Sequence, residues 1–165
     1  MYNVYLLTGS NQGDRLAQLN KACCLLEEKA GKIRKRSLVY ETASWGLEGL
    51  PAHYNQALFL QTDLEPPALL ENIHTIENLM GRVRQQKWGI RNIDIDIIYF
   101  ENFIIRRPQL RVPHPLMQER NFVLVPLTEI APDFIHPVLL KTNKALLAES
   151  GDTLAVKVVE AARMR

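Results

Sequence analysis

The stretch Gly81–Phe100, GRVRQQKWGIRNIDIDIIYF, decides the fold that we expect for this chain of 165 residues. Its second half alternates apolar and acidic residues, which is typical of a β-strand, where side chains two positions apart leave the same face. Asp94 and Asp96 are therefore expected to lie side by side, with their Cα atoms about 6.5 Å apart. The opposite face would carry three isoleucines into a core: Ile93, Ile95 and Ile97.

The first half of the stretch is cationic. Four basic residues occur there with no acid among them: Arg82, Arg84, Lys87 and Arg91. An exposed basic turn explains them equally well when they are taken alone, but arginine also binds phosphate through two parallel hydrogen bonds and keeps its charge. Trp88 lies among them, and it would pack on the protein body, stack on a ring or close over a site as a lid. Cations followed by paired carboxylates indicate a polyphosphate held with a divalent metal.

A solvated face of an edge strand is the simplest explanation of Asp94 and Asp96. The flanking isoleucines and the continuation Ile97-Ile98 favour instead a central strand, where two carboxylates repel each other. A divalent cation would remove that cost. Mg²⁺ suits the pair because it takes one or two carboxylates, retains water and accepts phosphate oxygens. Two such ions bridging phosphates would act as Lewis acids and as a template.

Outward from this stretch, hydrophobic periodicity and turn residues predict alternating strands and helices. Strands are expected at Tyr2–Thr8, over Arg34, Arg36 and Leu38–Glu41, at Tyr54–Leu64, in the central IDIDIIYF run, at Phe103–Ile105 as its hairpin partner, and at Leu154–Val159. Helices are expected between Leu16 and Gly31, from Pro66 to Met80, at Asn121–Ile130 and at Leu139–Glu149, with loops at 42–53 and 106–115. This order predicts a single α+β domain with a mostly antiparallel sheet and helices packed against it.

Composition places the chain among ordinary soluble proteins, with 47% hydrophobic and 23% charged residues. A net charge of +2 is too small to indicate wholesale binding to nucleic acid or membrane. Cys23 and Cys24 are adjacent, whereas a disulfide framework or a metal site needs spaced cysteines. The start of the chain lacks a signal-peptide pattern, and no apolar run approaches about 18 residues. We therefore expect a cytoplasmic protein.

Other patterns narrow the chemistry. The Gly-x-x-x-x-Gly-Lys-Ser/Thr loop is absent, which excludes a P-loop kinase, and no Ser-His-Asp or Cys-His arrangement is present. His114 stands between two prolines, with Arg111 before it and Arg120 after it. A lone histidine is more often structural than functional, yet the neighbouring cations make a phosphate contact a real alternative.

Taken together, these residues resemble the 6-hydroxymethyl-7,8-dihydropterin pyrophosphokinase family of folate biosynthesis. The matching pieces run from near the start to about residue 137: Gly9-Ser10-Asn11, Tyr40-Glu41-Thr42, Trp45-Gly46, Asn55, Glu77, Gly81-Arg82-Val83-Arg84, Trp88-Gly89, Arg91, Asp94-Ile95-Asp96-Ile97, Pro113-His114-Pro115, Arg120-Asn121-Phe122, Pro126-Leu127 and Glu129-Ile130-Ala131-Pro132. The combination is specific, although no single piece is.

The resemblance implies a ferredoxin-like domain over residues 1–165 and a Mg²⁺-dependent diphosphotransferase. It would transfer pyrophosphate from ATP to the hydroxymethyl group of the pterin and release AMP. The implied catalytic residues are Arg82, Arg91, Asp94 and Asp96, of which the aspartates would hold two Mg²⁺ ions. The implied nucleotide contacts are Glu77, Arg84, Trp88, Ile97, Arg111, His114 and Arg120. The implied pterin site comprises Thr42, Ser44, Trp45, His53, Asn55 and Phe122. We expect a monomer whose partners are these two small molecules, with no nucleic acid and no membrane.

Three positions depart from the family pattern. Ser44 stands where proline is usual, His53 where an aromatic ring commonly stacks on the pterin, and Arg111 where a smaller residue is usual.

Two rival functions remain at this point. A ferredoxin-like RNA-binding module would display paired aromatic residues on its strands, whereas this strand displays aspartates. A Mg²⁺-dependent nucleotidyltransferase would release pyrophosphate rather than AMP.

Overall fold

A computed structural model describes residues 1–43, 51–81 and 92–160 of the chain. Within these ranges, six strands form one sheet in the order β5-β1-β4-β3-β8, with β2 pairing to β4 beside this path. The strands of this sheet are β1 (Tyr2–Ser10), β2 (Lys32–Arg36), β3 (Tyr40–Thr42), β4 (His53–Thr62), β5 (Asp94–Phe100) and β8 (Val156–Val158). Every pairing between them is antiparallel. The predicted α+β fold with a mostly antiparallel sheet is confirmed.

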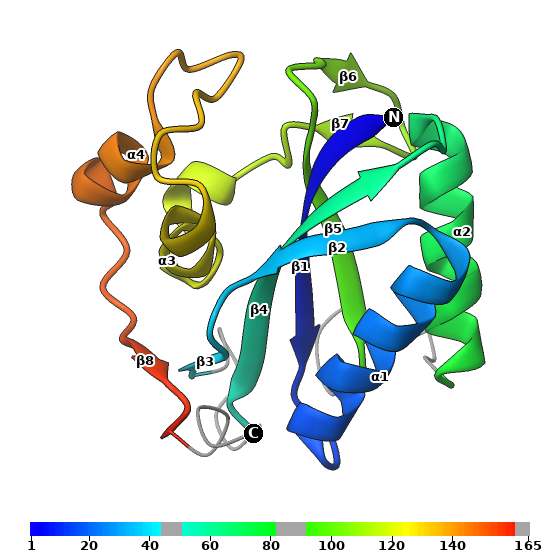
Figure 1. Cartoon of the computed structure of the whole chain (residues 1–165). Helices are drawn as coiled ribbons and strands as arrows, with labels where there is room; N and C mark the ends of the chain where they lie inside the picture. Colours follow the sequence, from blue (N-terminus) through cyan, green and yellow to red (C-terminus); the bar gives the residue numbers. More distant parts are fainter. Residues whose placement is uncertain (44–50, 82–91, 161–165) are drawn as a thin grey trace.

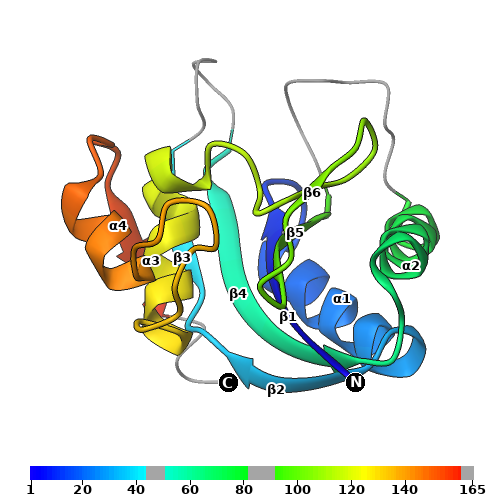
Figure 2. The same cartoon turned by 90° about the horizontal axis from the view of Figure 1, so that it is seen from above.

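The helices cover both faces of this sheet. They are α1 (Arg15–Lys29), α2 (Pro66–Leu79), α3 (Asn121–Ile130) and α4 (Asn143–Glu149), together with the short 3₁₀ turn η1 (Met117–Glu119). Figures 1 and 2 show α1 and α2 on one side of the sheet and α3 and α4 on the other. Among the described residues, no helix is both long and apolar enough to cross a membrane.

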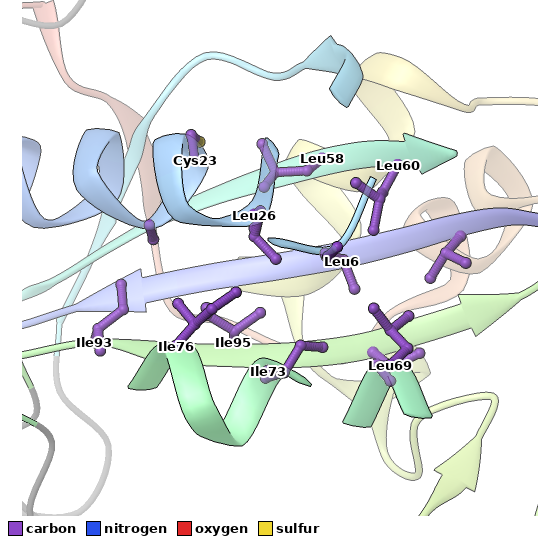
Figure 3. Close-up of a cluster of buried hydrophobic side chains, with 14 of the residues drawn as sticks. Leu6, Cys23, Leu26, Leu58, Leu60, Leu69, Ile73, Ile76, Ile93 and Ile95 are labelled. Carbon is purple, nitrogen blue, oxygen red and sulfur yellow. The ribbon is translucent and has the colours of Figure 1, made fainter. Parts of the chain in front are cut away.

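Two apolar clusters hold these layers together. The larger one fills the space between the sheet and helices α1 and α2, and Figure 3 shows ten of its labelled members: Leu6, Cys23, Leu26, Leu58, Leu60, Leu69, Ile73, Ile76, Ile93 and Ile95. The second lies under α3 and α4 and includes Leu7, Ala57, Ile98, Tyr99 and Leu124. Adjacent residues of β1, such as Leu6 and Leu7, belong to different clusters because side chains alternate between the faces of a strand.

Both ends of α1 follow the sequence pattern. Asp14 caps its start, since its carboxylate accepts a hydrogen bond from the Ala17 backbone N–H at 3.0 Å. The helix stops before Gly31, as expected. The reason for glycine there is close packing, because a Cβ on Gly31 would lie 2.1 Å from the carbonyl oxygen of Gln61.

The position of β5 in the sheet differs from the prediction. The strand that carries the aspartates was expected in the centre, but it stands at one end of the strand order and pairs with β1 alone among the described strands. It is nevertheless buried, because the larger cluster takes in Ile95 and Ile97 on one face while the second cluster takes in Ile98 on the other. Burial of both faces, rather than a central position, explains the apolar residues of β5.

A β-bulge interrupts the side-chain alternation of β5 after Ile98, so that Ile98 and Tyr99 belong to the same cluster. Leu6 of β1 is paired with Ile97, but the preceding residue Tyr5 is paired with Tyr99, so Ile98 is an extra residue on β5. Such a bulge shifts the side-chain alternation by one position. Tyr99 consequently joins Tyr5 in the second cluster, although the uninterrupted alternation would have placed it on the opposite face.

The single strand expected over Arg34, Arg36 and Leu38–Glu41 is instead two strands, β2 and β3, that pair with different parts of β4. Ser37 interrupts the ladder between them. Its Oγ accepts a hydrogen bond from the backbone N–H of Ala57 at 2.9 Å, and its carbonyl accepts one from Gln56 Nε2 at 2.8 Å. The serine side chain therefore replaces a backbone partner at this point.

The prediction that Phe103–Ile105 pairs with β5 as a hairpin was wrong. Glu101 takes a left-handed conformation with φ of 49°, and the chain then leaves the main sheet. A separate two-stranded ribbon follows, made of β6 (Ile105–Arg106) and β7 (Arg111–Val112). The predicted partner strand Phe103–Ile105 thus overlaps β6 only at its last residue, and the loop expected at 106–115 contains β7.

Helix α4 begins at Asn143 and not at Leu139 as predicted. Leu140 has a positive φ of 58°, which ends any helical path through it. Thr142 then caps α4, with its hydroxyl accepting from the Ala145 N–H at 3.1 Å. The apolar residues before it, which the pattern counted as helical, form a surface turn instead.

His136 organises that turn and makes its stability depend on pH. The buried ring accepts hydrogen bonds at Nδ1 from the backbone N–H groups of Val138 and Leu139, at 3.1 and 3.0 Å. Burial lowers the pKa of His136 below its ordinary value. Unfolding therefore takes up a proton once the pH falls below about 6.5, the pKa of an unfolded histidine. We expect the free energy of unfolding to decrease as the pH is lowered through this range.

The variant His136→Asn isolates this contribution, because an Asn side-chain oxygen can accept the same bonds without titrating. Chemical denaturation at several pH values between 5 and 7.5 should show a smaller decrease for His136→Asn than for the unmodified protein. Equal pH dependence of the two proteins would show that His136 does not carry the effect.

Candidate active site

Side chains from three adjacent strands meet on the α3 face of the sheet. Gly9 of β1 pairs with Asn55 of β4 on one side and with Asp94 of β5 on the other. Neighbouring strands lie about 4.8 Å apart, so the Asn55 and Asp94 backbones are separated by about 10 Å. Two residues along, Leu7 occupies the same place between Ala57 and Asp96. The chain thus sets an amide and two carboxylates on one face, with a glycine between them.

Asp94 and Asp96 are both partly exposed, while Ile95 between them is 4% exposed. The predicted arrangement, with carboxylates on one face and isoleucines on the other, matches this burial pattern. Among the described residues, no group of three or more His, Cys, Asp or Glu side chains could hold a metal. Two carboxylates still fit Mg²⁺, because that ion completes its shell with water and substrate phosphate.

The edge of β5 that faces away from β1 forms hydrogen bonds with residues from two other segments. Glu77 of α2 is 1% exposed, and its Oε2 accepts a hydrogen bond from the Ile95 N–H at 3.0 Å. The His114 N–H donates to the carbonyl of Ile98 at 3.0 Å. Two residues implied at the nucleotide site, Glu77 and His114, therefore both contact the strand that carries the aspartates.

His114 is influenced by the charges of Asp94, a candidate metal ligand, and Arg120, a candidate nucleotide contact. Burial is the main cause that lowers its pKa, and the positive charge of Arg120 lowers it further. A hydrogen bond to the Pro115 carbonyl, at 2.8 Å from Nδ1, and the negative charge of Asp94 act in the opposite direction. We assign Nδ1 as the donor because a carbonyl oxygen only accepts.

Two of the residues implied for the pterin have a buried polar atom without a hydrogen-bond partner among the described residues. The two atoms are Thr42 Oγ1 and Asn55 Oδ1, on side chains that are 3% and 6% exposed. Their strands β3 and β4 are paired, with Thr42 opposite His53 and Tyr40 opposite Asn55. Buried polar groups are nearly always hydrogen-bonded in native proteins. These two atoms are therefore available to a ligand that offers hydrogen-bond donors and acceptors.

Gly9 leaves room for the Asn55 amide. Asn55 Nδ2 donates to the carbonyl of Thr8 at 3.2 Å, which fixes the orientation of the amide and commits its donor side to β1. A Cβ on Gly9 would lie 2.6 Å from that Nδ2, closer than real Cβ contacts allow. Glycine is needed at this position for close approach.

His53 begins β4 and lies beside Thr42, where the resemblance predicts a pterin contact. Its Nε2 is 3.4 Å from Nδ2 of Asn11, a residue that is fully buried. The histidine that replaces the usual aromatic residue therefore has a defined place at the edge of the site.

Phe122 and Arg120 lie at the start of α3, with the Arg120 guanidinium carbon 5.8 Å from the centre of the Phe122 ring. The C-terminal part of the chain holds this helix start, because Asp152 Oδ2 accepts from the Asn121 N–H at 2.8 Å. Strand β8 also pairs with β3 beside Thr42. Residues beyond 138, which lie outside the part of the sequence that resembles the family, thus contact both the start of α3 and the strand that carries Thr42.

Arg15 supports the strands of the site from the opposite face of the sheet, a role that the sequence pattern did not reveal. It donates to the carbonyl of Ala52 at 2.8 Å, forms an ion pair with Glu41 at 3.6 Å and lies 3.8 Å above the ring of Tyr54. These contacts tie the start of α1 to β3 and β4. An arginine after a helix cap is common, so its type and position alone gave no signal.

The remaining predicted site residues are of two kinds, those outside the described residues and those that the structure places elsewhere. Six lie outside the described residues: Ser44, Trp45, Arg82, Arg84, Trp88 and Arg91. Arg111 is exposed on β7, opposite Arg106. Ile97 is 5% exposed in the larger cluster, so its side chain is a core residue and only its backbone could reach a ligand.

Comparisons with known proteins identify the family of this site. Residues 5–132 match the family model "7,8-dihydro-6-hydroxymethylpterin-pyrophosphokinase (HPPK)". A 2-amino-4-hydroxy-6-hydroxymethyldihydropteridine pyrophosphokinase of Aquifex aeolicus is 43% identical over 91% of this chain and 93% of its own length. The protein of that name from Bacillus subtilis is 45% identical over 76% of both chains.

Longer proteins contain the same unit. The folic acid synthesis protein FOL1 of Dictyostelium discoideum is 46% identical over 87% of this chain, which spans only 22% of FOL1. The HPPK-DHPS structure of Plasmodium falciparum superposes with a TM-score of 0.75 over 90% of this chain and 43% of that one, at 20% identity, which confirms the fold. With the family model and the curated relatives in agreement, the chain belongs to the 7,8-dihydro-6-hydroxymethylpterin-pyrophosphokinase family.

Proposed function

We propose that this chain transfers pyrophosphate from ATP to the hydroxymethyl group of 6-hydroxymethyl-7,8-dihydropterin and releases AMP, a step of folate biosynthesis. The observation that carries the proposal is the row Asn55, Gly9 and Asp94 across three paired strands. It sets a ring-binding amide and a metal-binding carboxylate about 10 Å apart on one face. An acceptor and a metal-bound triphosphate would then lie side by side.

The donor half of the site would be built on Asp94 and Asp96. Their partly exposed carboxylates fit two Mg²⁺ ions, each completed by water and phosphate oxygens. When bound, these ions neutralise charge on the phosphates and act as Lewis acids. The carboxylates themselves fix where the triphosphate can lie relative to the acceptor.

The proposal gives the remaining phosphate and nucleotide contacts to residues that match the family pattern. They are Arg82 and Arg91 for charge that develops during transfer, and Arg84, Trp88, Ile97, Arg111, His114 and Arg120 for the nucleotide. Glu77, which the family pattern also puts at the nucleotide, is 1% exposed and accepts a hydrogen bond from the Ile95 N–H. The proximity of His114 to Asp94 and Arg120 supports its place there. A contact from Ile97 would use its backbone, because its side chain is buried in the core.

The acceptor half would bind the pterin by its amide edge and its ring face. Asn55 Oδ1 would accept a hydrogen bond from a ring N–H, and Thr42 Oγ1 would satisfy a second polar atom of the edge. Phe122 would stack on one face of the ring, and His53 would contribute a second ring at the edge of the site. Ser44 and Trp45 complete the set that the family pattern implies.

Catalysis in this proposal is mainly positioning and electrostatic stabilisation. Holding the hydroxymethyl oxygen in line with the β-phosphorus removes the entropy cost of bringing two substrates together. The arginines would then neutralise negative charge that develops at the reacting phosphorus. A strong general base is not required, which agrees with the lack of an obvious one in the sequence.

One chain supplies the placed residues of both halves: Thr42, Asn55, Asp94, Asp96 and Phe122 all belong to it. This supports a monomer that acts as one domain on small molecules. The pairing of β8 with β3 supports including residues up to 160 in that domain. The cytoplasmic location expected from the sequence stays a prediction.

Product analysis tests the proposed reaction. The protein should consume ATP in the presence of Mg²⁺ and 6-hydroxymethyl-7,8-dihydropterin, and form AMP and the pterin pyrophosphate in equal amounts. Omitting the pterin or adding excess EDTA should stop AMP formation. Release of ADP would indicate single-phosphate transfer, and release of free pyrophosphate would indicate nucleotidyl transfer; either product would contradict the proposal.

A further inference from the structure

Glu77 is a buried carboxylate in a mostly apolar layer. It lies on α2 at 1% exposure, next along the chain to the core residue Ile76. Removing a carboxylate from water is costly unless the group is well hydrogen-bonded. An apolar residue would pack α2 against the sheet without that cost, so the acid at this position needs a reason beyond packing.

Its contact with β5 gives that reason. Glu77 Oε2 accepts from the backbone N–H of Ile95 at 3.0 Å, and Ile95 lies between Asp94 and Asp96 in the chain. The carboxylate therefore holds the strand backbone at the point midway between the two candidate metal ligands. A hydrogen bond to an ionised acceptor is shorter and stronger than one between neutral groups.

The bond also completes a set of contacts along the free edge of β5. Asn92 joins the end of α2 to the start of the strand, since its Nδ2 donates to the Met80 carbonyl and its Oδ1 accepts from the Ile93 N–H at 3.0 Å. His114 holds the strand at Ile98. Glu77 lies between these two attachments, and without it the Ile95 N–H would lose this partner at a buried sheet edge.

Glu77 acts from the opposite side of the strand to the carboxylates. Helix α2 contributes its buried residues to the larger cluster, which lies on the isoleucine face of β5, whereas Asp94 and Asp96 leave the other face. Within the described residues, Glu77 forms no group of three potential ligands with the aspartates. Glu77 is linked to the strand of the aspartates by its hydrogen bond to the backbone of β5.

We propose that Glu77 is a positioning residue that sets the β5 backbone so that Asp94 and Asp96 together bind Mg²⁺. This inference rests on the proposed function and deepens it, because it gives Glu77 a role in metal binding apart from any contact with the nucleotide. Groups that orient metal ligands from outside typically change metal affinity by about 10- to 100-fold when they are removed.

Three variants separate this role from simple stability. Glu77→Leu removes the acceptor and keeps an apolar side chain of similar size, Glu77→Gln keeps a neutral acceptor, and Glu71→Gln changes an exposed acid of the same helix. Mn²⁺ binding is measured by electron paramagnetic resonance in the presence of a non-hydrolysable ATP analogue. Binding of a fluorescent ATP analogue in EDTA is measured in parallel, and thermal unfolding reports the fold.

We expect Glu77→Leu to weaken Mn²⁺ binding at least about 10-fold, Glu77→Gln to fall between it and the unmodified protein, and Glu71→Gln to have no effect. Metal-free nucleotide binding should change less than about 2-fold in all three. Unchanged Mn²⁺ binding by a folded Glu77→Leu protein would overturn the inference, as would an equal loss of metal-free nucleotide binding, which would assign Glu77 to the nucleotide itself.

If Glu77→Leu does not fold, Glu77→Gln decides the question with amide hydrogen exchange. Faster exchange at Ile95 together with weaker Mn²⁺ binding supports the positioning role, whereas faster exchange with unchanged Mn²⁺ binding refutes it. The proposed function is tested separately by the unmodified protein, whose failure to bind both Mn²⁺ and nucleotide would contradict that function.

Discussion

Replacing Asp96 by Ala is expected to lower turnover about 1000-fold while the protein remains folded. The loss corresponds to about 4 kcal/mol of transition-state stabilisation, the order expected when a metal no longer neutralises the reacting phosphates. Asp96 contributes little to the core, since its side chain is partly exposed and the neighbouring Ile95 and Ile97 hold the strand. Steady-state AMP formation and thermal unfolding of the same preparation measure the two effects.

The exposed acid Asp133 offers a matched control. Asp133→Ala changes the net charge by the same amount at a distance from the proposed site, so it should leave AMP formation unchanged. Near-normal turnover by Asp96→Ala would remove the proposed metal role from this residue. A large loss of thermal stability would instead show that the aspartate is needed for folding.

Replacing Gly9 by Ala is expected to weaken pterin binding by about 10- to 100-fold, the effect of disturbing one or two buried hydrogen bonds. The added Cβ would lie 2.6 Å from Asn55 Nδ2 and would displace the amide from the Thr8 carbonyl. Asn55 Oδ1 would then no longer point where the pterin edge is proposed to bind. ATP binding should change much less, because Asn55 supplies the nearest side-chain atoms to the new Cβ.

Isothermal titration with the pterin and with a non-hydrolysable ATP analogue would separate the two affinities. Gly151→Ala is the control, because no atom lies within 4 Å of its added Cβ. Equal weakening of both ligands by Gly9→Ala would mean that the substitution distorts the sheet as a whole. Unchanged pterin binding would exclude Asn55 as the residue that reads the ring edge.

Local patterns predicted much of this structure because their physical cause is local. The alternation of Asp94 and Asp96 with isoleucines correctly predicted a strand with one polar and one apolar face. Gly31 marked the end of α1, since the close approach to β4 there needs a glycine. The metal site that the paired carboxylates indicate stays a prediction.

The errors arose where distant contacts decide the structure. The position of β5 at the end of the sheet depends on helices that bury it from both faces, and a strand's own residues do not report which neighbours cover it. The bulge at Ile98 is likewise a property of the pairing with β1. The consecutive apolar residues near His136 favoured a helix in the sequence analysis. Hydrophobic periodicity does not report the hydrogen bonds that His136 Nδ1 accepts, and these bonds form a turn there.

The acceptor half of the site could be predicted only through resemblance. Thr42 and Asn55 are far apart in the chain and meet through the pairing of β3 with β4. A threonine and an asparagine have many structural uses, so neither residue type indicates a ligand. Only the structure shows that both side chains are buried with polar atoms that lack a described partner.

A crystal structure with Mg²⁺, a non-hydrolysable ATP analogue and 6-hydroxymethyl-7,8-dihydropterin tests the central claim most directly. The claim is that both substrates bind on the α3 face of the sheet, on either side of Gly9. We expect metal ions that bridge Asp94 and Asp96 to the phosphates, and a pterin whose ring edge donates to Asn55 Oδ1. A pterin bound away from Asn55, or a metal that touches neither aspartate, would contradict the account.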